Sequence, residues 1–229
     1  MGDAYCVAVP SLGRIRSVQA ARALAASRPR SRDVAQSVRV AFEFRAAGIR
    51  IVPQQIPAEI SAFLDLCAPL NPKSILEVGT DSGGTLFLLS SVADPSAKLV
   101  SVDLFGYPGW KAPLYASFAR GGQSLRLIRG DSHSPETIHQ VKGALGDAKL
   151  DLLFLDGDHS YAGVKKDFET YSPMVREGGI IALHDIVPTD PRSGAFACKF
   201  WAEVKEGRKH TEIVENWGQG AAGIGLLYA

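Results

Sequence analysis

The chain has 229 residues, a hydrophobic fraction of 46% and a formal net charge of +1. This length suffices for one domain with a sizeable core, and the near-zero charge excludes a long-range field that attracts nucleic acid. The three cysteines are scattered and form neither a disulfide framework nor a CxxC metal pattern. No apolar run approaches the ~18 residues of a membrane span, and the chain does not start with a signal-peptide pattern. We therefore expect a cytoplasmic protein that binds no nucleic acid.

The first 54 residues predict a helical extension, followed by a main domain over residues 55–229. One helical pattern covers residues 17–26, and a second begins near Asp33. Nine arginines lie between positions 14 and 50, against only two acidic residues. We interpret them as a solvated helix surface or a face that meets a partner subunit, and we expect a homo-oligomer. The alternative is a surface that binds an anionic substrate or a lipid head group.

In the main domain, strands and helices alternate after an opening helix that begins at Pro57. Helices are expected at 85–92, 135–145 and 161–175, and strands at 74–78, 98–102, 124–128, 150–155 and 179–183. Such alternation predicts an α/β fold with a mostly parallel sheet and helices on both of its faces. Two further strands, 211–215 and 222–228, follow without a helix between them, which makes seven strands.

The first strand ends in a glycine-rich turn with the sequence Glu77-Val78-Gly79-Thr80-Asp81-Ser82-Gly83-Gly84-Thr85. Glycines allow the backbone to turn sharply and to approach a ligand closely. The spacing is not G-x-G-x-x-G and no lysine follows the glycines, which disfavours a dinucleotide fingerprint and a phosphate-binding P-loop. Taken alone, the turn is as typical of a structural connection as of a binding site.

Acidic residues also follow the next two strands, where ligands of open α/β sheets bind. Asp103 ends the second strand, 26 positions after Glu77. A carboxylate there suits the hydroxyls of a ribose, because these are donors that need an acceptor. The third strand is followed by Gly130-Asp131-Ser132, a group suited to bracketing an adenine edge.

With these three strand ends, the sequence resembles the class I methyltransferases, which use S-adenosylmethionine and have a Rossmann-like seven-stranded sheet with an antiparallel last strand. The resemblance implies that Gly79 and Gly83 line the methionine part of this cofactor. It places Asp103 at the ribose, and Asp131 with Ser132 beside the adenine. Three more residues fall in the same cofactor site: Glu77, Thr80 and Asp156.

Charged residues also end the fourth and fifth strands. Asp156 follows the fourth, and His184 with Asp185 follows the fifth, 29 residues later. Polar groups at the end of an apolar strand are costly to bury unless they are paired or bind a metal. One strand–helix–strand unit separates the two ends, so in a parallel sheet they lie side by side. Carboxylate oxygens suit Mg²⁺ or Mn²⁺.

The stretch from Asp156 to Asp185 resembles the metal-dependent O-methyltransferases. The likeness is greatest to the group labelled cephalosporin-hydroxylase-like, which includes macrolide-sugar and rhamnosyl O-methyltransferases. It is carried by DGDHSY at 156–161, HDIVP at 184–188, WGQG at 217–220 and GIG at 223–225. The resemblance implies Asp156, His184 and Asp185 as metal ligands and His159 as the general base. Members of the group usually have an acidic residue where this chain has His184. An imidazole ligand favours Zn²⁺, Fe²⁺ or Mn²⁺ over Mg²⁺. The alternative is that His184 points away from the ion and contacts the ligands instead of binding it.

We therefore expect an O-methyltransferase that acts on a hydroxyl of a small molecule or glycoside, with a sugar hydroxyl first and a catechol-like phenol second. In the expected step, the metal lowers the pKa of the hydroxyl and His159 takes its proton. Two alternatives remain open. One is a metal-dependent hydroxylase or oxygenase, which would leave the glycine-rich turn without a function. The other is a non-catalytic cofactor-binding protein. Asp158 is interpreted as a turn or capping residue, and three histidines are interpreted as surface residues: His133, His139 and His210.

Overall fold

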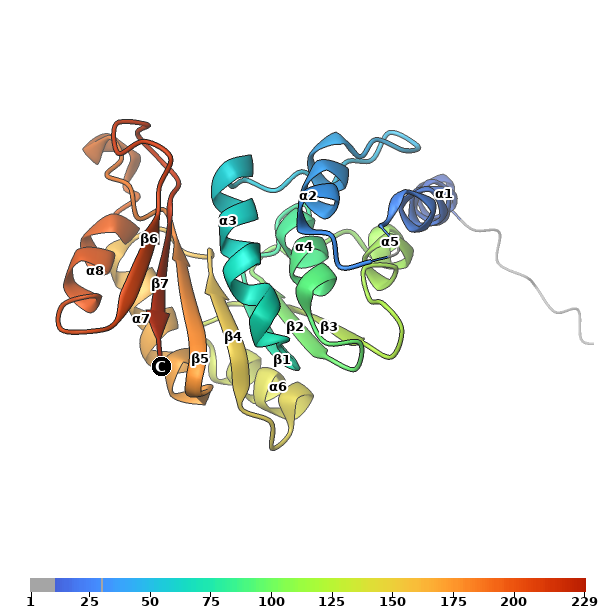
Figure 1. The fold of residues 1–229 in the computed structure, drawn as a ribbon. Helices are drawn as coiled ribbons and strands as arrows, with labels where there is room; N and C mark the ends of the chain where they lie inside the picture. The colour runs from blue at the N-terminus through green and yellow to red at the C-terminus, as the bar shows by residue number, and fades with distance from the viewer. Residues whose placement is uncertain (1–10, 30) are drawn as a thin grey trace, which may run out of the picture.

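The computed structural model describes residues 11–29 and 31–229. One seven-stranded sheet with the strand order β3-β2-β1-β4-β5-β7-β6 forms the centre of the molecule (Figure 1). The strands are β1 Ser74–Val78, β2 Lys98–Asp103, β3 Ser124–Arg129, β4 Leu150–Leu155, β5 Val175–His184, β6 His210–Ile213 and β7 Ile224–Tyr228. The order reverses between β1 and β4, and a ligand-binding crevice is expected at that switch point.

The strand directions agree with the seven-stranded α/β fold predicted from the sequence. β1 to β5 pair in parallel, with Val78 opposite Val102 on one side and Leu155 on the other. β7 runs antiparallel to both β5 and β6 and lies between them. Because the last strand is inserted, the loop between β6 and β7 reaches the carboxyl end of β5.

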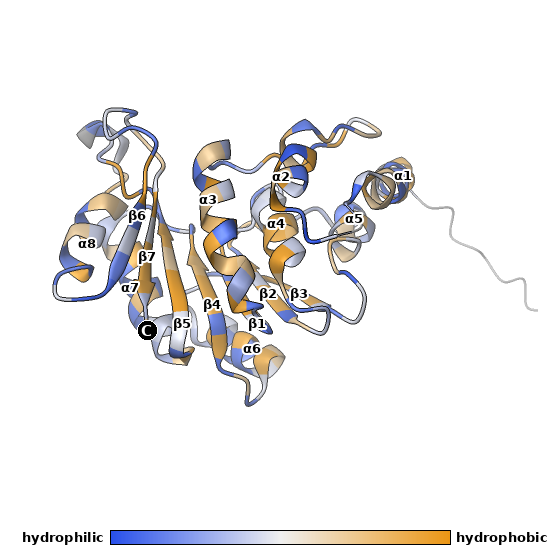
Figure 2. Ribbon diagram, in the orientation of Figure 1, coloured by the Kyte–Doolittle hydropathy of each residue, from blue (hydrophilic) through white to orange (hydrophobic). Residues whose placement is uncertain are grey.

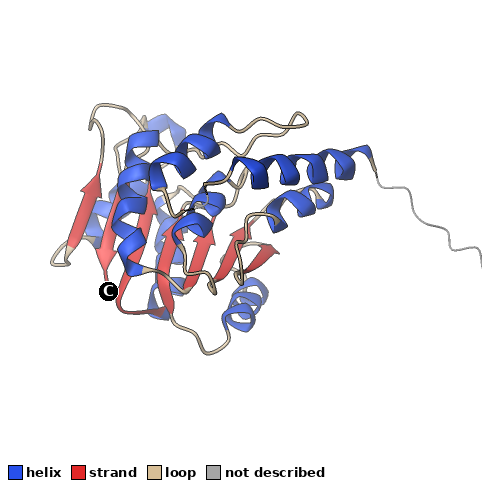
Figure 3. Ribbon diagram, turned by 45° about the vertical axis from the view of Figure 1, so that its right-hand side comes forward, coloured by secondary structure: helices blue, strands red, loops and turns tan. Residues whose placement is uncertain are grey.

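Helices cover both faces of the sheet, as expected (Figure 3). One face carries the first five helices: α1 Leu12–Ser27, α2 Val34–Glu43, α3 Pro57–Cys67, α4 Gly84–Val92 and α5 Ala112–Ala116. The other face carries α6 Pro135–Leu145, α7 Tyr161–Tyr171 and α8 Ala197–Val204. The central strands are largely apolar (Figure 2), and β1 and β4 are buried because both of their faces are covered.

Two expectations about the elements were wrong. The apolar stripe after β4 predicted a helix to position 175, but α7 ends at Tyr171 and Val175 begins β5. Pro173 accounts for the early end, since proline has no backbone N–H with which to continue the helical hydrogen bonds, and the chain there forms one 3₁₀ turn, Ser172–Met174. Two helices, α5 and α8, were also not predicted; Phe200 and Trp201 of α8 belong to the apolar cluster on the face that carries α6 and α7.

The helices ahead of α3 pack onto the rest of the described chain. Leu24 of α1 and Ala41 of α2 are fully buried and belong to the same apolar cluster as Phe87 of α4. The segment that leads into α3 crosses so close to Gly84 that a Cβ there would lie 2.1 Å from the carbonyl oxygen of Ile51. Only glycine fits at this crossing. Within the described residues, no helix is long and apolar enough to cross a bilayer.

Candidate active site

A cavity of about 870 Å³ opens at the carboxyl ends of β1 to β5. It lies at the switch point of the strand order, and all five strand-end clusters noted in the sequence reach it. Six of the residues expected at the cofactor line it: Gly79, Thr80, Asp103, Asp131, Ser132 and Asp156. His159, His184 and Asp185 line it too, whereas Glu77 and Gly83 do not.

The turn after β1 is shaped by close approach to β4. Gly79 has φ +97°, and a Cβ on it would lie 2.1 Å from the carbonyl oxygen of Asp156. Any side chain at position 79 would therefore push the two strand ends apart. The Asp156 amide donates to the carbonyl oxygen of Val78 at 2.8 Å, which fixes the carboxylate of Asp156 beside the turn.

Glu77 lies beneath the turn and does not line the cavity. It is fully buried and accepts a hydrogen bond from Ser101, whose hydroxyl is also 2.6 Å from the hydroxyl of Thr80. Burial raises the pKa of Glu77 well above its ordinary value. Its contact with any ligand is therefore indirect, through Ser101 and Thr80.

Asp103 accepts four backbone hydrogen bonds. One oxygen accepts from the amides of Thr80 and Asp81 at 3.0 and 3.1 Å, and the other from Phe105 and Gly106 at 2.9 and 2.7 Å. The carboxylate thus joins the turn after β1 to the turn after β2. Asp103, which was expected to bind the ribose, therefore also fixes the two turns that line the cavity.

His133 was interpreted as a surface residue, but it lines the cavity. Its Nε2 lies 3.2 Å from Asp167 of α7, a carboxylate that is 1% exposed. Burial raises the pKa of Asp167. Asp131 accepts from the amide of His133 at 2.9 Å, so the histidine orders the turn after β3. Asp167 lies 34 positions after His133 and on another element, so no local sequence pattern indicated that the two side chains pair.

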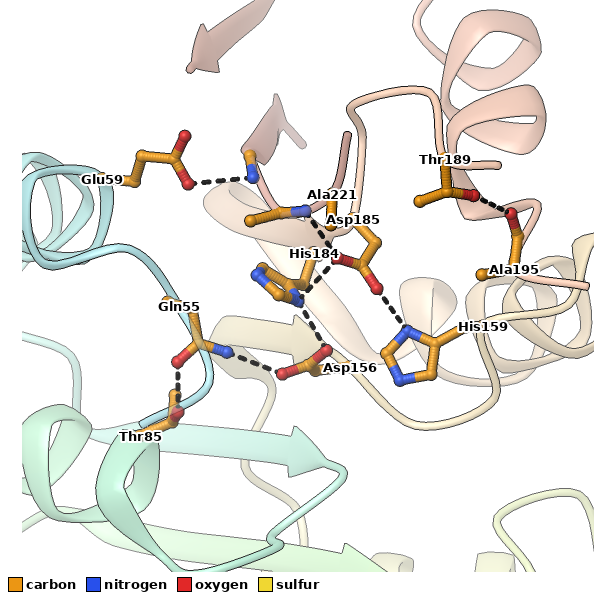
Figure 4. Close-up of polar contacts among 12 residues, drawn as sticks. Gln55, Glu59, Thr85, Asp156, His159, His184, Asp185, Thr189, Ala195 and Ala221 are labelled. Atoms are coloured by element: carbon orange, nitrogen blue, oxygen red, sulfur yellow. Dashed lines mark hydrogen bonds and ion pairs between the residues drawn. The ribbon is translucent and has the colours of Figure 1, made fainter. Parts of the chain in front are cut away.

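The two carboxylates after β4 and β5 each face a histidine (Figure 4). His159 Nδ1 lies 2.7 Å from Asp185 Oδ2, and His184 Nδ1 lies 2.8 Å from Asp156 Oδ1. His184 Nδ1 is also 3.4 Å from Asp185 Oδ1, so the four side chains form one connected group. The structure therefore brings together all the residues that the sequence suggested for base and metal.

Both histidines are drawn toward the protonated form. The hydrogen bond to Asp185 raises the pKa of His159, whose side chain is 44% exposed at the cavity. Burial lowers the pKa of His184, but the charge and hydrogen bond of Asp156 outweigh it and raise that pKa to about 9. Burial alone would raise the pKa of Asp185, yet its histidine partners lower it. The two carboxylates thus favour the protonated form of His184, which lies between them.

Two carboxylates and an imidazole suit a divalent ion in chemical type. Within the residues that the structure describes, however, no three His, Cys, Asp or Glu side chains are already grouped around one ion position. The carboxylate oxygens that would bind the ion are instead paired with histidine ring nitrogens, those of Asp185 with His159 and those of Asp156 with His184. Ion binding at Asp156, His184 and Asp185 would have to displace a proton from His184.

A glutamine that the sequence analysis did not select holds Asp156 from the other side. Gln55, 3% exposed, donates to Asp156 Oδ2 at 2.7 Å and accepts from the hydroxyl of Thr85 at 2.7 Å (Figure 4). It lies on the segment that crosses over Gly84 into α3. The site therefore includes a residue from the start of the main domain, about 100 positions before its partner.

Glu59 of α3, which is 1% exposed, holds the loop between β6 and β7. Its carboxylate accepts from the amide of Glu215 at 3.0 Å, from the side chain of Gln219 at 2.8 Å and from the amide of Gly223 at 2.9 Å. The next amide in this loop, that of Ala222, donates to Asp185 Oδ1 at 2.9 Å. This loop carries WGQG at 217–220, and the motif contributes the side chain of Gln219, while backbone amides on either side of it make the other contacts.

Asp185 has a strained backbone, with φ +60° in the left-handed region. This conformation follows directly on the end of β5 and turns the carboxylate back toward His159 and Ala222. Strain of this kind costs free energy and persists only where surrounding contacts fix it. The hydrogen bonds to the carboxylate are the contacts that do so.

A family model described as a methyltransferase domain matches residues 76–186, the stretch from β1 to the end of β5. An uncharacterized protein of Sinorhizobium fredii is 27% identical over 146 residues, which cover 59% of this chain and 15% of that protein. The chain spans at most half the length of the curated relatives it matches.

Solved structures share the fold at low sequence identity. The O-methyltransferase TomG from Streptomyces achromogenes, involved in tomaymycin synthesis and solved with S-adenosylmethionine, has a TM-score of 0.56 and 17% identity, over 96% of this chain and 99% of TomG. MycE of the mycinamycin pathway, solved with Mg, S-adenosylhomocysteine and mycinamycin VI, has a TM-score of 0.58 and 15% identity, over 87% and 54%. The chain therefore has the Rossmann-like methyltransferase fold.

Proposed function

We propose that this chain is an S-adenosylmethionine-dependent O-methyltransferase with His159 as its general base. The observation that supports it most is the pair of His159 and Asp185 in the cavity that the glycine turn of β1 also lines. A base oriented by a carboxylate, next to a cofactor-type turn, is the arrangement that methylation of a hydroxyl needs. The match to a methyltransferase domain and the folds of TomG and MycE add support.

The proposed step divides between cofactor and side chains. Bound S-adenosylmethionine supplies an electrophilic methyl group. His159 accepts the hydroxyl proton of the acceptor at Nε2, because its Nδ1 is held by Asp185. Asp185 then stabilises the imidazolium that results. The cavity wall of Gly79, Thr80 and Asp103 positions the cofactor, and correct positioning is worth roughly 7–11 kcal/mol of the barrier.

The proposed acceptor is a hydroxyl of a small molecule or a glycoside, with a sugar hydroxyl ahead of a catechol-like phenol. MycE, whose structure holds mycinamycin VI, supports the first choice. We also propose a divalent ion, Mg²⁺ or Mn²⁺, held by Asp156, His184 and Asp185, which would polarise the acceptor oxygen. The magnesium in the MycE structure supports this part. The last part of the proposal is that the chain forms a homo-oligomer, and light scattering of the purified protein tests it.

The first experiment is calorimetric titration of the protein with S-adenosylhomocysteine, with NAD⁺ as the control ligand. Binding of the first and not the second supports the cofactor assignment; no binding of S-adenosylhomocysteine overturns it. Transfer of labelled methyl groups to glycosides and catechols then tests the acceptor.

The metal is tested apart from turnover, by titrating MnCl₂ into the protein and into the Asp156→Asn variant. Binding heat that the variant loses supports the ion, and equal heats in both proteins contradict it.

A further inference from the structure

An arginine cluster lies at the amino-terminal ends of the strands, away from the cavity. It consists of Arg28, at the end of α1, Arg120, in the turn before β3, and Arg32, in the segment before α2. None of the three lines the candidate active site. Arg32 donates to the side chain of Asn71, just ahead of β1, which places the cluster at this end of the sheet.

Two of these guanidinium groups are buried without an acceptor for most of their donors. In the described part of the chain, Nε and Nη2 of both Arg28 and Arg120 are out of contact with solvent and have no hydrogen-bond partner. The one acceptor to which Arg28 donates within residues 11–29 and 31–229 is the carbonyl oxygen of Ala119, at 3.4 Å from Nη1. An arginine presents its N–H groups as a rigid fork, which suits two oxygens of one anion.

The three charges also lie close enough to repel one another. Burial first, and then Arg120, lower the pKa of Arg28 to about 10; burial and Arg32 lower that of Arg120. Among residues 11–29 and 31–229, no ion pair joins any of the three to a carboxylate. Arg28 is stabilised only in part by the ring of Phe87, 5.0 Å from its guanidinium carbon. Two partly buried guanidinium groups, with the exposed Arg32 beside them, thus lack a carboxylate partner within the described residues.

We propose that Arg28 and Arg120, assisted by Arg32, bind the phosphate group of a ligand between the N-terminal extension and the main domain. A phosphate offers several oxygens and a double negative charge, which matches two guanidinium forks and a third arginine. Because Arg28 ends α1 and Arg120 belongs to the domain, the bound phosphate would hold the extension in place. Figure 1 shows α1 lying against α5, beside this junction.

The phosphate can belong to a soluble phosphate ester or to a lipid head group, and the experiment separates these sources. Helix α1 exposes the apolar side chains of Leu12, at 73%, and Ile15, at 42%, which could contact a lipid surface. The experiment therefore has one part in solution and one part with membranes. The soluble arm measures melting temperature with sodium phosphate against sodium chloride at equal ionic strength. The membrane arm measures co-sedimentation with vesicles of phosphatidylglycerol against vesicles of phosphatidylcholine.

In the soluble arm, phosphate at ten times its dissociation constant raises the melting temperature by about 3–6 °C. Arg28→Gln and Arg120→Gln abolish the rise, whereas Arg22→Gln, an exposed arginine of α1, keeps it. The matched Arg22 variant separates binding from a general salt effect. Calorimetric titration of the unmodified protein with phosphate gives a second measurement that does not depend on the variants.

Vesicle binding that both cluster variants lose, without a phosphate effect in solution, assigns the site to a lipid head group. The site does not exist if phosphate gives neither heat nor stabilisation and phosphatidylglycerol vesicles do not bind. It is equally overturned if Arg22→Gln loses the effect to the same extent as the two cluster variants.

Discussion

His159 and Asp185 are joined at 2.7 Å between Nδ1 and Oδ2, although they come from different strand ends. The contact leaves Nε2 of His159 on the opposite edge of the ring, free to take a proton. It also explains why the strained backbone of Asp185 is tolerated, since the turn is what aims the carboxylate.

The role of His159 as base predicts that His159→Ala lowers kcat by a factor on the order of 10²–10⁴, because proton transfer in the step is lost. Affinity for S-adenosylhomocysteine stays within about twofold of the unmodified protein, because the cofactor end of the cavity is untouched. Steady-state kinetics and calorimetry measure the two quantities. His139→Ala, on the exposed side of α6, is the control and keeps full activity. Normal turnover by His159→Ala would remove the base assignment.

Replacement of Gln55 tests whether the segment before α3 supports the site. Gln55→Ala leaves the hydroxyl of Thr85 and one oxygen of Asp156 without their partner, so the free energy of unfolding falls by about 1–3 kcal/mol. Gln54→Ala removes only an exposed contact to Asp81 and changes stability by less than about 0.5 kcal/mol. Urea unfolding of both variants measures the difference, and equal values would contradict a supporting role for Gln55.

Glu59 is expected to contribute to stability because it holds the loop between β6 and β7 by three hydrogen bonds. Glu59→Gln replaces one carboxylate oxygen by an amide group that cannot accept from the loop between β6 and β7. The loss of at least one charge-assisted bond lowers the free energy of unfolding by about 1.5–3 kcal/mol. Glu43→Gln, at the exposed end of α2, serves as the control. The idea fails if urea unfolding shows both variants equally stable.

The raised pKa of Glu77 predicts a pH dependence of stability. The folded state keeps the proton above the ordinary value of 4.5, whereas the unfolded state releases it, so stability falls as pH rises past that value. Glu77→Gln does not titrate. Its advantage over the unmodified protein therefore grows above pH 4.5, by about 1.4 kcal/mol per pH unit, until the folded carboxyl ionises.

Thermal unfolding between pH 4 and pH 8 measures this advantage. The control is Glu136→Gln on the exposed start of α6, whose curve is expected to parallel that of the unmodified protein. Parallel curves for Glu77→Gln as well would show that Glu77 ionises normally in the folded chain.

Periodicity predicted what depends on local sequence. The strands β1 and β4 and the helix α6 begin and end where their apolar patterns do, because each is bounded by turn residues or a proline. The pattern failed at Val175, where the helical stripe ran across Pro173 into a strand. Periodicity cannot show such a change when apolar residues continue on both sides.

Strand ends also indicated the residues around the cavity, since parallel strands bring their carboxyl ends together. The side chains that contact these residues could not be predicted, because they do not come from strand ends. Gln55, Glu59 and Asp167 lie on helices or loops far away in sequence, and nothing local distinguishes them from surface residues. Which atoms of His159 and His184 face the carboxylates was likewise beyond any spacing argument.

The insertion of β7 between β5 and β6 has a consequence for synthesis on the ribosome. A nascent chain that has reached Asp185 already contains His159 and both carboxylates, but not the amide of Ala222 that holds Asp185, nor β7, which pairs with β5. Chains emerge from their N-terminal end and fold as units. Translation must therefore pass β7 before Asp185 can gain the contact that fixes its carboxylate in the candidate site.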